Sequence, residues 1–299
     1  MNIVIFGAGA IGSLFGGLLS KMHDVVLIGR SSYVNAVRKN GLKVIGKTQL
    51  NVKIHAEELV NNVEIYPDLL ILTVKAYDTE SAMKQARKII DDDTVVLSLQ
   101  NGLDNIEIMK KYVDCKKVIA GVTTHGAFFS NPGIVEHTGM GGTILGELDG
   151  KKTLRIENIV NAFNQSDIVT DLSEEIIKEM WVKAVVNSSI NPLTTFFQCK
   201  NGYLRENPIL KSIVEEVCNE STAIANTRGI NLSGKKMFDR TVDVIKKTSE
   251  NYSSMLQSLK RGKKTEIDSI NGKIVEIGKI HNVDTLINET LVYLVKSMC

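Results

Sequence analysis

The chain has few of the residues that build specialised scaffolds. Its 299 residues include only four cysteines and four prolines, and aromatic residues make up 5% of the sequence. The cysteines, none of which forms a Cys-x-x-Cys pair, are Cys115, Cys199, Cys218 and Cys299. We therefore expect neither a disulfide framework nor a metal site. No apolar run approaches the roughly 18 residues that a membrane-spanning helix needs.

An excess of charge of one sign is also missing. The 36 basic and 34 acidic side chains leave a formal net charge of +2, so no general field attracts nucleic acid or a membrane surface. An apolar strand that starts at residue 2 leaves no room for a signal peptide, and we expect a cytoplasmic protein. With 43% hydrophobic and 23% charged residues, the composition is typical of a globular protein of one large domain or two ordinary ones.

The most informative segment opens the chain. Residues 2–6 predict a buried strand, and a helical pattern begins without a break after the next six residues, which are Gly7, Ala8, Gly9, Ala10, Ile11 and Gly12. In a dinucleotide-binding loop the first glycine permits the tight turn, the second lets the backbone approach the pyrophosphate, and the third allows close helix packing. The helix N-terminus presents N–H groups to the anion. We predict a dinucleotide site here; the alternative is a glycine-rich turn in another α/β protein.

Strands and helices alternate through the first half of the chain. Buried parallel strands are expected at residues 3–6, 25–29, 69–74, 94–97 and 117–120, with helical patterns at residues 12–21, 79–90 and 105–112. This alternation predicts a doubly wound α/β domain over residues 1–170. Residues 41–45 and 49–55 predict a small hairpin inserted in the sheet. Short runs between residues 122 and 148 predict strands at its far edge, and residues 167–170 one more strand.

The second half has a different pattern. After residue 171 the sequence is almost wholly helical, which predicts an all-α C-terminal domain over residues 171–299. Asp171-Leu-Ser-Glu174 resembles a capping box that opens its first helix. Further helices are expected near residues 208–227, 234–248, 267–281 and 285–298. No linker marks the boundary, which rests on the change of pattern alone.

The end of the second predicted strand indicates which dinucleotide binds. Arg30, followed by Ser31 and Ser32, stands where an acidic residue would bind the ribose of NAD. A guanidinium with two neighbouring hydroxyls suits a 2′-phosphate, so we expect NADP+ and NADPH. The alternative is a solvated surface arginine in an enzyme that accepts either cofactor.

Two further loops follow predicted strands at the same edge of the sheet. Lys75 is a candidate to meet a phosphate or a substrate charge, although a solvated surface lysine explains it equally well. Asn101 is a candidate contact of the nicotinamide ribose, although with Gly102 it also forms a common turn dipeptide. Both pairs of alternatives stay open.

A polar face interrupts an apolar helical stretch at residues 179–194. Lys183, Asn187 and Asn191 are spaced at i, i+4 and i+8, so on a helix they project from one face. Partial removal of an ammonium group from water makes it a better proton donor. The alternative is a solvated polar stripe. This alternative fits less well, because the three positions carry one charge and two amides rather than the mixed charges usual on a solvated helix face. Pro192 is expected to kink or end this helix.

A second polar constellation lies nearer the C-terminus. Asn251 and Ser254 lie in a loop-like stretch, and Glu266 and Asp268 stand at the start of a predicted helix. Carboxylates are favoured at a helix N-terminus on electrostatic grounds alone. Spacing therefore does not choose between these two acids.

Taken together, these motifs resemble the ketopantoate reductase (2-dehydropantoate 2-reductase) family over the whole chain. The segments that carry the resemblance are residues 7–12, 75–76, 100–102, 121–125, 181–183, 187, 191–194, 201–202, 254–255 and 265–272. The resemblance implies a Rossmann domain followed by a helical domain, with the active site between them. It also implies that NADPH delivers a hydride to the C2 carbonyl of 2-dehydropantoate, which gives pantoate for pantothenate and coenzyme A synthesis.

The same resemblance implies residue roles. Lys183 is the general acid that protonates the forming alkoxide, and Glu266 holds that lysine or the substrate's hydroxyl. Ser254, with Asn251, holds the substrate's carboxylate end. The residues implied to orient the substrate or fix the cofactor are Asn187, Asn191, Lys75 and Asn101.

Other functions are compatible with the same residues. One alternative is the same chemistry on another branched 2-oxo acid. Another is a dinucleotide-binding sensor without catalysis, which would need the glycine loop but not a proton donor. We expect a small 2-oxo acid as the partner molecule, no nucleic acid and no membrane, and leave a homodimer open.

Overall fold

The computed structural model describes residues 1–298 and divides the chain into two compact units. Unit 1 comprises residues 1–100 and 105–176, and unit 2 comprises residues 101–104 and the chain from residue 177 onward. The division falls a few residues after the predicted boundary at 170, because residues 170–172 form a strand that pairs within unit 1. No helix in the described part of the chain is both long and apolar enough to cross a membrane.

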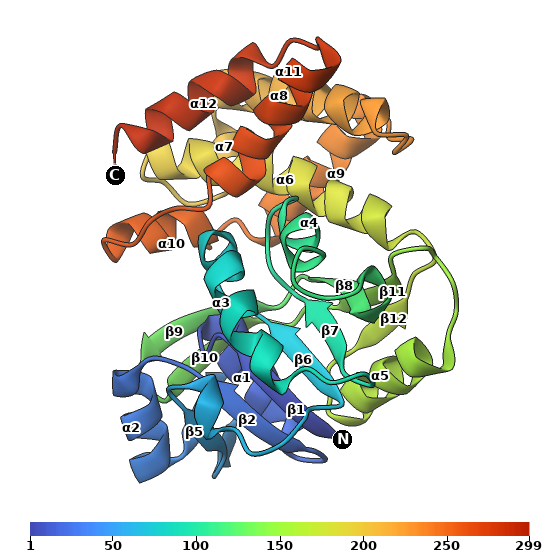
Figure 1. The fold of residues 1–299 in the computed structure, drawn as a ribbon. Helices are drawn as coiled ribbons and strands as arrows, with labels where there is room; N and C mark the ends of the chain where they lie inside the picture. Colours follow the sequence, from blue (N-terminus) through green and yellow to red (C-terminus); the bar gives the residue numbers. More distant parts are fainter. Residues whose placement is uncertain (299) are drawn as a thin grey trace. The chain divides into compact units, whose positions relative to one another are not determined.

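Unit 1 is built on an eight-stranded sheet in the order β12-β11-β8-β7-β6-β1-β2-β5 (Figure 1). Its strands are β1 (Asn2–Phe6), β2 (Asp24–Ile28), β5 (His55–Glu57), β6 (Leu69–Leu72), β7 (Val95–Ser98), β8 (Val118–Thr123), β11 (Thr143–Glu147) and β12 (Thr170–Leu172). β1 pairs in parallel with β2 on one side and β6 on the other, whereas β11 runs antiparallel to β8. The strand order therefore reverses direction beside β1, which makes the carboxyl ends of β1 and β6 the place where such sheets bind ligands.

A second sheet corrects two of the expectations. Its four strands, in the order β4-β3-β10-β9, are β3 (Leu42–Gly46), β4 (Leu50–Val52), β9 (Gly126–Asn131) and β10 (Ile134–Gly139). The predicted hairpin forms as β3 and β4, but it is not inserted in the main sheet. The assignment of residues 122–148 to the far edge of the main sheet is right for β11 and wrong for β9 and β10.

Helix α1 (Ala10–Leu19) explains why two sheets form, because it packs against both. A Cβ on Gly16 would lie 2.5 Å from Leu27 of the main sheet, and a Cβ on Gly17 would lie 3.2 Å from Val44 of the second sheet. The remaining helices of unit 1 are α2 (Ser31–Asn40), α3 (Thr79–Ala86), α4 (Asn105–Met109) and α5 (Leu154–Gln165). The two sheets thus bury one helix and place its N-terminus at the end of β1.

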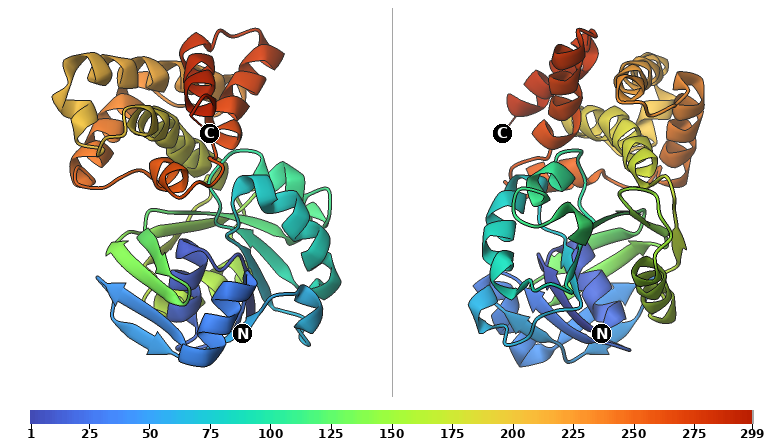
Figure 2. Two further views of the ribbon diagram at one scale, coloured as in Figure 1. Left: turned by 90° about the vertical axis from the view of Figure 1, so that its left-hand side faces the viewer. Right: turned by 45° about the vertical axis from the view of Figure 1, so that its right-hand side comes forward.

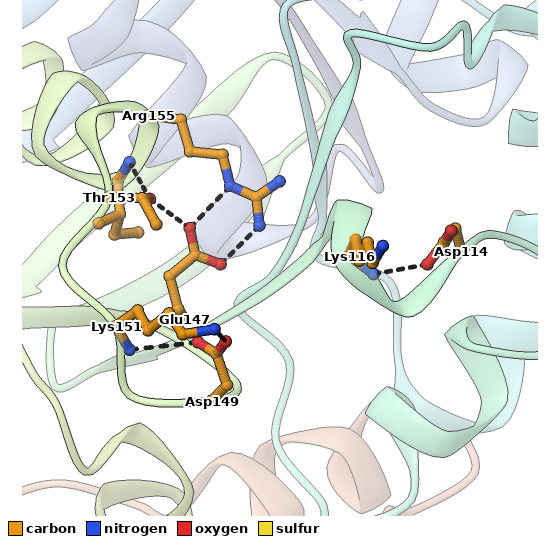
Figure 3. Close-up of polar contacts among 8 residues, drawn as sticks. Asp114, Lys116, Glu147, Asp149, Lys151, Thr153 and Arg155 are labelled. Atoms are coloured by element: carbon orange, nitrogen blue, oxygen red, sulfur yellow. Dashed lines mark hydrogen bonds and ion pairs between the residues drawn. The ribbon is translucent and has the colours of Figure 1, made fainter.

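A partly buried ion pair links β11, next to the edge strand of the main sheet, to α5 (Figure 3). The carboxylate of Glu147, at the end of β11, accepts two bonds from Arg155, at 2.7 Å from Nε and 2.5 Å from Nη2. The Thr153 hydroxyl donates to the same carboxylate at 2.6 Å and also caps α5. The hydrogen bonds to Glu147 raise the pKa of Arg155. Such a bidentate pair joins β11 to α5 with defined geometry.

Unit 2 is all-helical, as predicted. Its elements are α6 (Ile176–Phe196, which starts at the end of unit 1), α7 (Tyr203–Glu206), α8 (Pro208–Thr227), α9 (Gly234–Lys247), α10 (Ser254–Lys260), a π-helical turn η5 (Asp268–Gly272), α11 (Lys273–His281) and α12 (Leu286–Lys296). Figure 2 shows α6 lying among α8, α9 and α12, and apolar residues of these four helices form one buried cluster. The fold class is therefore the predicted one, an α/β unit followed by an all-α unit.

One local expectation about the second half of the chain is wrong, and two are refined. Asp171 lies in β12 rather than in a capping box, and the Ser173 hydroxyl accepts the N–H of Glu175 instead. The helical stretch predicted over residues 267–281 is confirmed, but its first turn, residues 268–272, is π-helical and α11 follows it. Of the kink or end expected at Pro192, the end is excluded, because α6 continues to Phe196.

Candidate functional site

The glycine loop follows β1 in a conformation that only glycine adopts easily. Gly7 has φ +116°, and a Cβ there would lie 2.6 Å from the backbone nitrogen of Val74. The N–H groups of Gly7 and Ala8 donate to the carbonyl of Ile28 at 3.0 and 2.9 Å. The turn is thus held between the ends of β2 and β6, at the switch point of the sheet.

Thr73 contacts the glycine loop, and the sequence analysis did not predict this contact. Its hydroxyl donates to the carbonyl of Gly7 at 2.7 Å. A Cβ on Gly12 would lie 2.2 Å from that carbonyl oxygen and 2.5 Å from the Thr73 hydroxyl. The available signal was its position at the end of a predicted strand. Gly12 is therefore required by the packing of the loop itself.

Gly9 differs from its two neighbours, because the protein's own packing does not require it. A Cβ there would meet only the carbonyl oxygen of Gly7, at 4.0 Å. Gly9 is the N-cap of α1, and within the described residues no side chain caps this helix. The first N–H groups of a helix, here from Ala10, Ile11 and Gly12, lack intrahelical partners. An uncapped helix end beside an open glycine fits the pyrophosphate of a dinucleotide.

Arg30 stands at the N-cap of α2 and is exposed. The structure adds an acidic residue that sequence spacing does not reveal, because the Ser31 hydroxyl donates to the carboxylate of Glu58, just after β5. The N–H of Gly29 donates to the carbonyl of Glu57 at 3.0 Å, which keeps this segment beside β2. Arg30, which is expected to meet a 2′-phosphate, is therefore followed by a serine, Ser31, whose hydroxyl is hydrogen-bonded to the carboxylate of Glu58.

The segment after β6 is held by residues at the end of β7. Gln100 Nε2 donates to the carbonyl of Val74 at 2.9 Å and to the hydroxyl of Thr79 at 2.7 Å. Lys75, partly exposed, follows Val74 directly and is the N-cap of a short 3₁₀ turn. Asn101 is also partly exposed and begins the short segment 101–104 that packs with unit 2.

The predicted polar face lies on α6. Lys183 and Asn187 are partly exposed, and Asn191 is buried. Since α6 is continuous through all three positions, the i, i+4, i+8 spacing places them along one side of the helix. The burial of Asn191 excludes a fully solvated stripe.

The segment that carries Asn251 and Ser254 is tied to α6. The Thr194 hydroxyl donates to the hydroxyl of Ser253 at 2.7 Å, and Ser253 caps α10. The sequence suggested that Ser254 lies in a loop, but in the structure it is the exposed first residue of α10. Asn251 is exposed, and its carbonyl accepts the N–H of Asn201 at 3.0 Å.

The structure distinguishes Glu266 from Asp268, the two acidic residues between which the sequence spacing could not choose. Glu266 is buried, with 6% of its surface exposed, and lies just before the π-helical turn. Asp268 has 46% of its side chain exposed and pairs with Lys296 at 2.6 Å. Asp268 is thus a surface ion-pair residue, and Glu266 is the candidate for a role in chemistry.

Comparisons with known proteins agree with this geometry. Residues 3–150 match the family model described as Ketopantoate reductase PanE/ApbA, and residues 175–298 match that of its C-terminal part. A 2-dehydropantoate 2-reductase of Pyrococcus abyssi is 45% identical over 297 residues, which covers 99% of this chain and 97% of the relative.

Solved structures extend the likeness over both units. The ternary structure of D-mandelate dehydrogenase with NADH and anilino(oxo)acetate has a TM-score of 0.95 at 29% identity, with 100% of this chain and 98% of that chain covered. A PanE/ApbA family ketopantoate reductase from Ralstonia eutropha JMP134 has a TM-score of 0.92 at 28% identity, with the same coverage. Matches to both family models, spanning most of the sequence, show that this chain belongs to the ketopantoate reductase family.

Proposed function

We propose that this protein reduces 2-dehydropantoate to pantoate with NADPH, a step of pantothenate and coenzyme A synthesis. The observation that carries the proposal is the face of Lys183, Asn187 and Asn191 on α6, in a unit that also buries Glu266. A protein that only sensed a dinucleotide would need the glycine loop but no such face. The 45% identical relative from Pyrococcus abyssi, itself a 2-dehydropantoate 2-reductase, supports the same assignment.

In this proposal Lys183 is the proton donor. Bound NADPH supplies a hydride to the C2 carbonyl of the substrate, whose oxygen then gains negative charge and needs a proton. An ammonium group at Lys183 stabilises that charge as it develops and provides the proton. Glu266 is proposed to orient the lysine or the substrate's hydroxyl, because a buried carboxylate requires a hydrogen-bonding or charged partner.

The amides and the serine are proposed to bind the substrate. Asn187 and Asn191 offer both donors and acceptors to the carbonyl end of a 2-oxo acid. Ser254 and Asn251 are proposed to bind its carboxylate, and both are exposed and therefore accessible to a ligand.

The proposed cofactor contacts lie mainly in unit 1. The backbone of Gly7–Gly12 binds the pyrophosphate, with Lys75 and Asn101 as further contacts. Arg30 is proposed to bind the 2′-phosphate and so to favour NADPH. Glu58 opposes this preference, since its carboxylate is bonded to the adjacent Ser31.

A second candidate function is the reduction of another 2-oxo acid. The likeness to D-mandelate dehydrogenase, whose structure holds NADH and anilino(oxo)acetate, favours it specifically. The two are separated by ranking kcat/KM for a panel of 2-oxo acids with each cofactor. The proposed function requires 2-dehydropantoate to rank first and its analogue without the C4 hydroxyl to lose most of that kcat/KM.

Location and assembly are part of the proposal. The free thiols of Cys115, Cys199 and Cys218 fit a reducing compartment, and we propose that the enzyme acts in the cytoplasm. A homodimer is a hypothesis that light scattering on the purified protein tests directly.

A further inference from the structure

A proline inside α6 leaves one backbone carbonyl without its helical partner. In an α-helix the carbonyl of residue i accepts the N–H of residue i+4, and Pro192 has no N–H to offer Ser188. Ser188 has 0% of its surface exposed, so water does not reach this position. An unpaired buried carbonyl is costly, and the partner must come from outside the helix.

That partner is the side chain of Asn271. Its Nδ2 donates to the carbonyl of Ser188 at 3.0 Å and to Oδ1 of Asn288 at 2.9 Å. Asn288 is held in turn by Glu220, which accepts its Nδ2–H at 2.8 Å and its backbone N–H at 2.9 Å. Both N–H groups of Asn271 are therefore committed, and the amide has one orientation.

Asn271 belongs to the same short segment as Glu266. It lies in the π-helical turn that follows Glu266, where the N–H of Ile270 donates to the carbonyl of Glu266 at 3.1 Å. The N–H of Gly272 donates to the carbonyl of Ile267 at 2.9 Å. Single π-helical turns are rare in proteins, and many of those that do occur lie at functional sites.

The accepting carbonyl lies on the polar helix that carries the proposed proton donor. Ser188 directly follows Asn187, and Asn191 directly precedes Pro192. The bond from Asn271 to Ser188 therefore joins the backbone of α6 to the segment of Glu266. It does so at the carbonyl of α6 that Pro192 leaves without a helical N–H partner.

We propose that Asn271 is a positioning residue for the reaction. Its bond to the carbonyl freed by Pro192 sets Glu266 relative to Lys183, Asn187 and Asn191. Asn271 itself is fully buried and does not act on the substrate. This inference rests on the proposed function, because it assumes that Lys183 and Glu266 serve one reaction.

A double-mutant cycle tests the inference. Asn271→Leu removes the donor at similar volume, and Pro192→Ala restores a backbone N–H that can reach the carbonyl of Ser188. In the wild-type background, Asn271→Leu should lower kcat for 2-dehydropantoate roughly 10- to 100-fold, since small misplacements of catalytic groups have effects of that size. The Kd for NADPH should change by less than about twofold, because the glycine loop lies in unit 1.

Because the N–H restored in Pro192→Ala takes over the carbonyl of Ser188, this variant should itself lower kcat, and Asn271→Leu in that background should lower kcat further by less than about threefold. The lost bond to Asn288 affects both backgrounds equally and cancels. Equal losses of kcat in the two backgrounds, or an unchanged kcat for Asn271→Leu alone, would overturn the inference. If the leucine variant does not fold, Asn271→Ala in the same backgrounds is judged by the same criteria. A wild-type protein inactive on 2-dehydropantoate would instead refute the proposed function.

Discussion

Gly9 and Gly12 offer a matched pair of substitutions with opposite expected effects. Both belong to the glycine loop, and each gains one methyl group when replaced by alanine. At Gly12 the new Cβ would lie 2.2 Å from the carbonyl oxygen of Gly7, whereas at Gly9 the nearest atom is 4.0 Å away. The first glycine is needed by the fold, and the second is needed only if a ligand approaches the backbone.

The sizes of the two effects follow from these distances. Overpacking at Gly12 should cost about 1–3 kcal/mol of folding free energy, a drop in melting temperature of roughly 2–12 °C for a domain of this size. Gly9 has φ −83° and ψ −160°, an extended conformation that alanine adopts, so Gly9→Ala should leave the protein without cofactor as stable as before or about 0.4–1 kcal/mol more stable. Loss of backbone bonds to the charged pyrophosphate should cost about 1.5–3 kcal/mol, or roughly 10- to 150-fold in Kd for NADPH.

The assay combines thermal unfolding without cofactor and titration of NADPH by its fluorescence. Gly9→Ala should weaken binding without loss of melting temperature, and Gly12→Ala should lower the melting temperature. If Gly9→Ala binds NADPH as tightly as the unaltered protein, the pyrophosphate does not lie against Gly9 and the proposed cofactor site is misplaced.

Three further predictions concern single side chains. Lys183→Ala should lower kcat roughly 10²- to 10⁴-fold, as loss of a general acid does, while stopped-flow binding of NADPH is unchanged; a near-normal kcat excludes the proposed role. Arg30→Ala should raise KM for NADPH but not for NADH, and Glu58→Gln should lower KM for NADPH, because the carboxylate beside Ser31 repels a phosphate; steady-state kinetics with both cofactors measure each. Burial, with a smaller effect of neighbouring His137, lowers the pKa of His125 from 6.5 to about 4. The unfolded chain therefore binds more protons in that window, and the free energy of unfolding should fall as pH drops from 6.5 towards 4; urea titrations of His125→Gln should show a shallower fall.

Most features of the fold and the site that depend on local sequence pattern could be predicted from the sequence. The glycine loop after an apolar strand, the helical second half and the face on α6 depend on neighbours within a few residues. The bounds of α8 match the prediction, because Asn207 caps it and Pro208 starts it, both local signals.

What the sequence did not predict depends on residues far apart in the chain. The strands β9 and β10 have ordinary strand patterns, and only the pairing of β10 with β3, and of β9 with β10, decides which sheet they join. Pro192 predicts a kink or an end of the helix, yet α6 continues, and Asn271, 83 residues from Ser188, satisfies the carbonyl that the proline frees. Glu58 likewise meets Ser31 only because β5 pairs with β2.

The central claim is that this chain reduces 2-dehydropantoate at the expense of NADPH. The most direct measurement incubates the purified protein with both compounds and determines NADPH oxidised and pantoate formed in the same samples. The account predicts one pantoate for each NADPH consumed. Tight binding of NADPH with no oxidation in the presence of 2-dehydropantoate would contradict it.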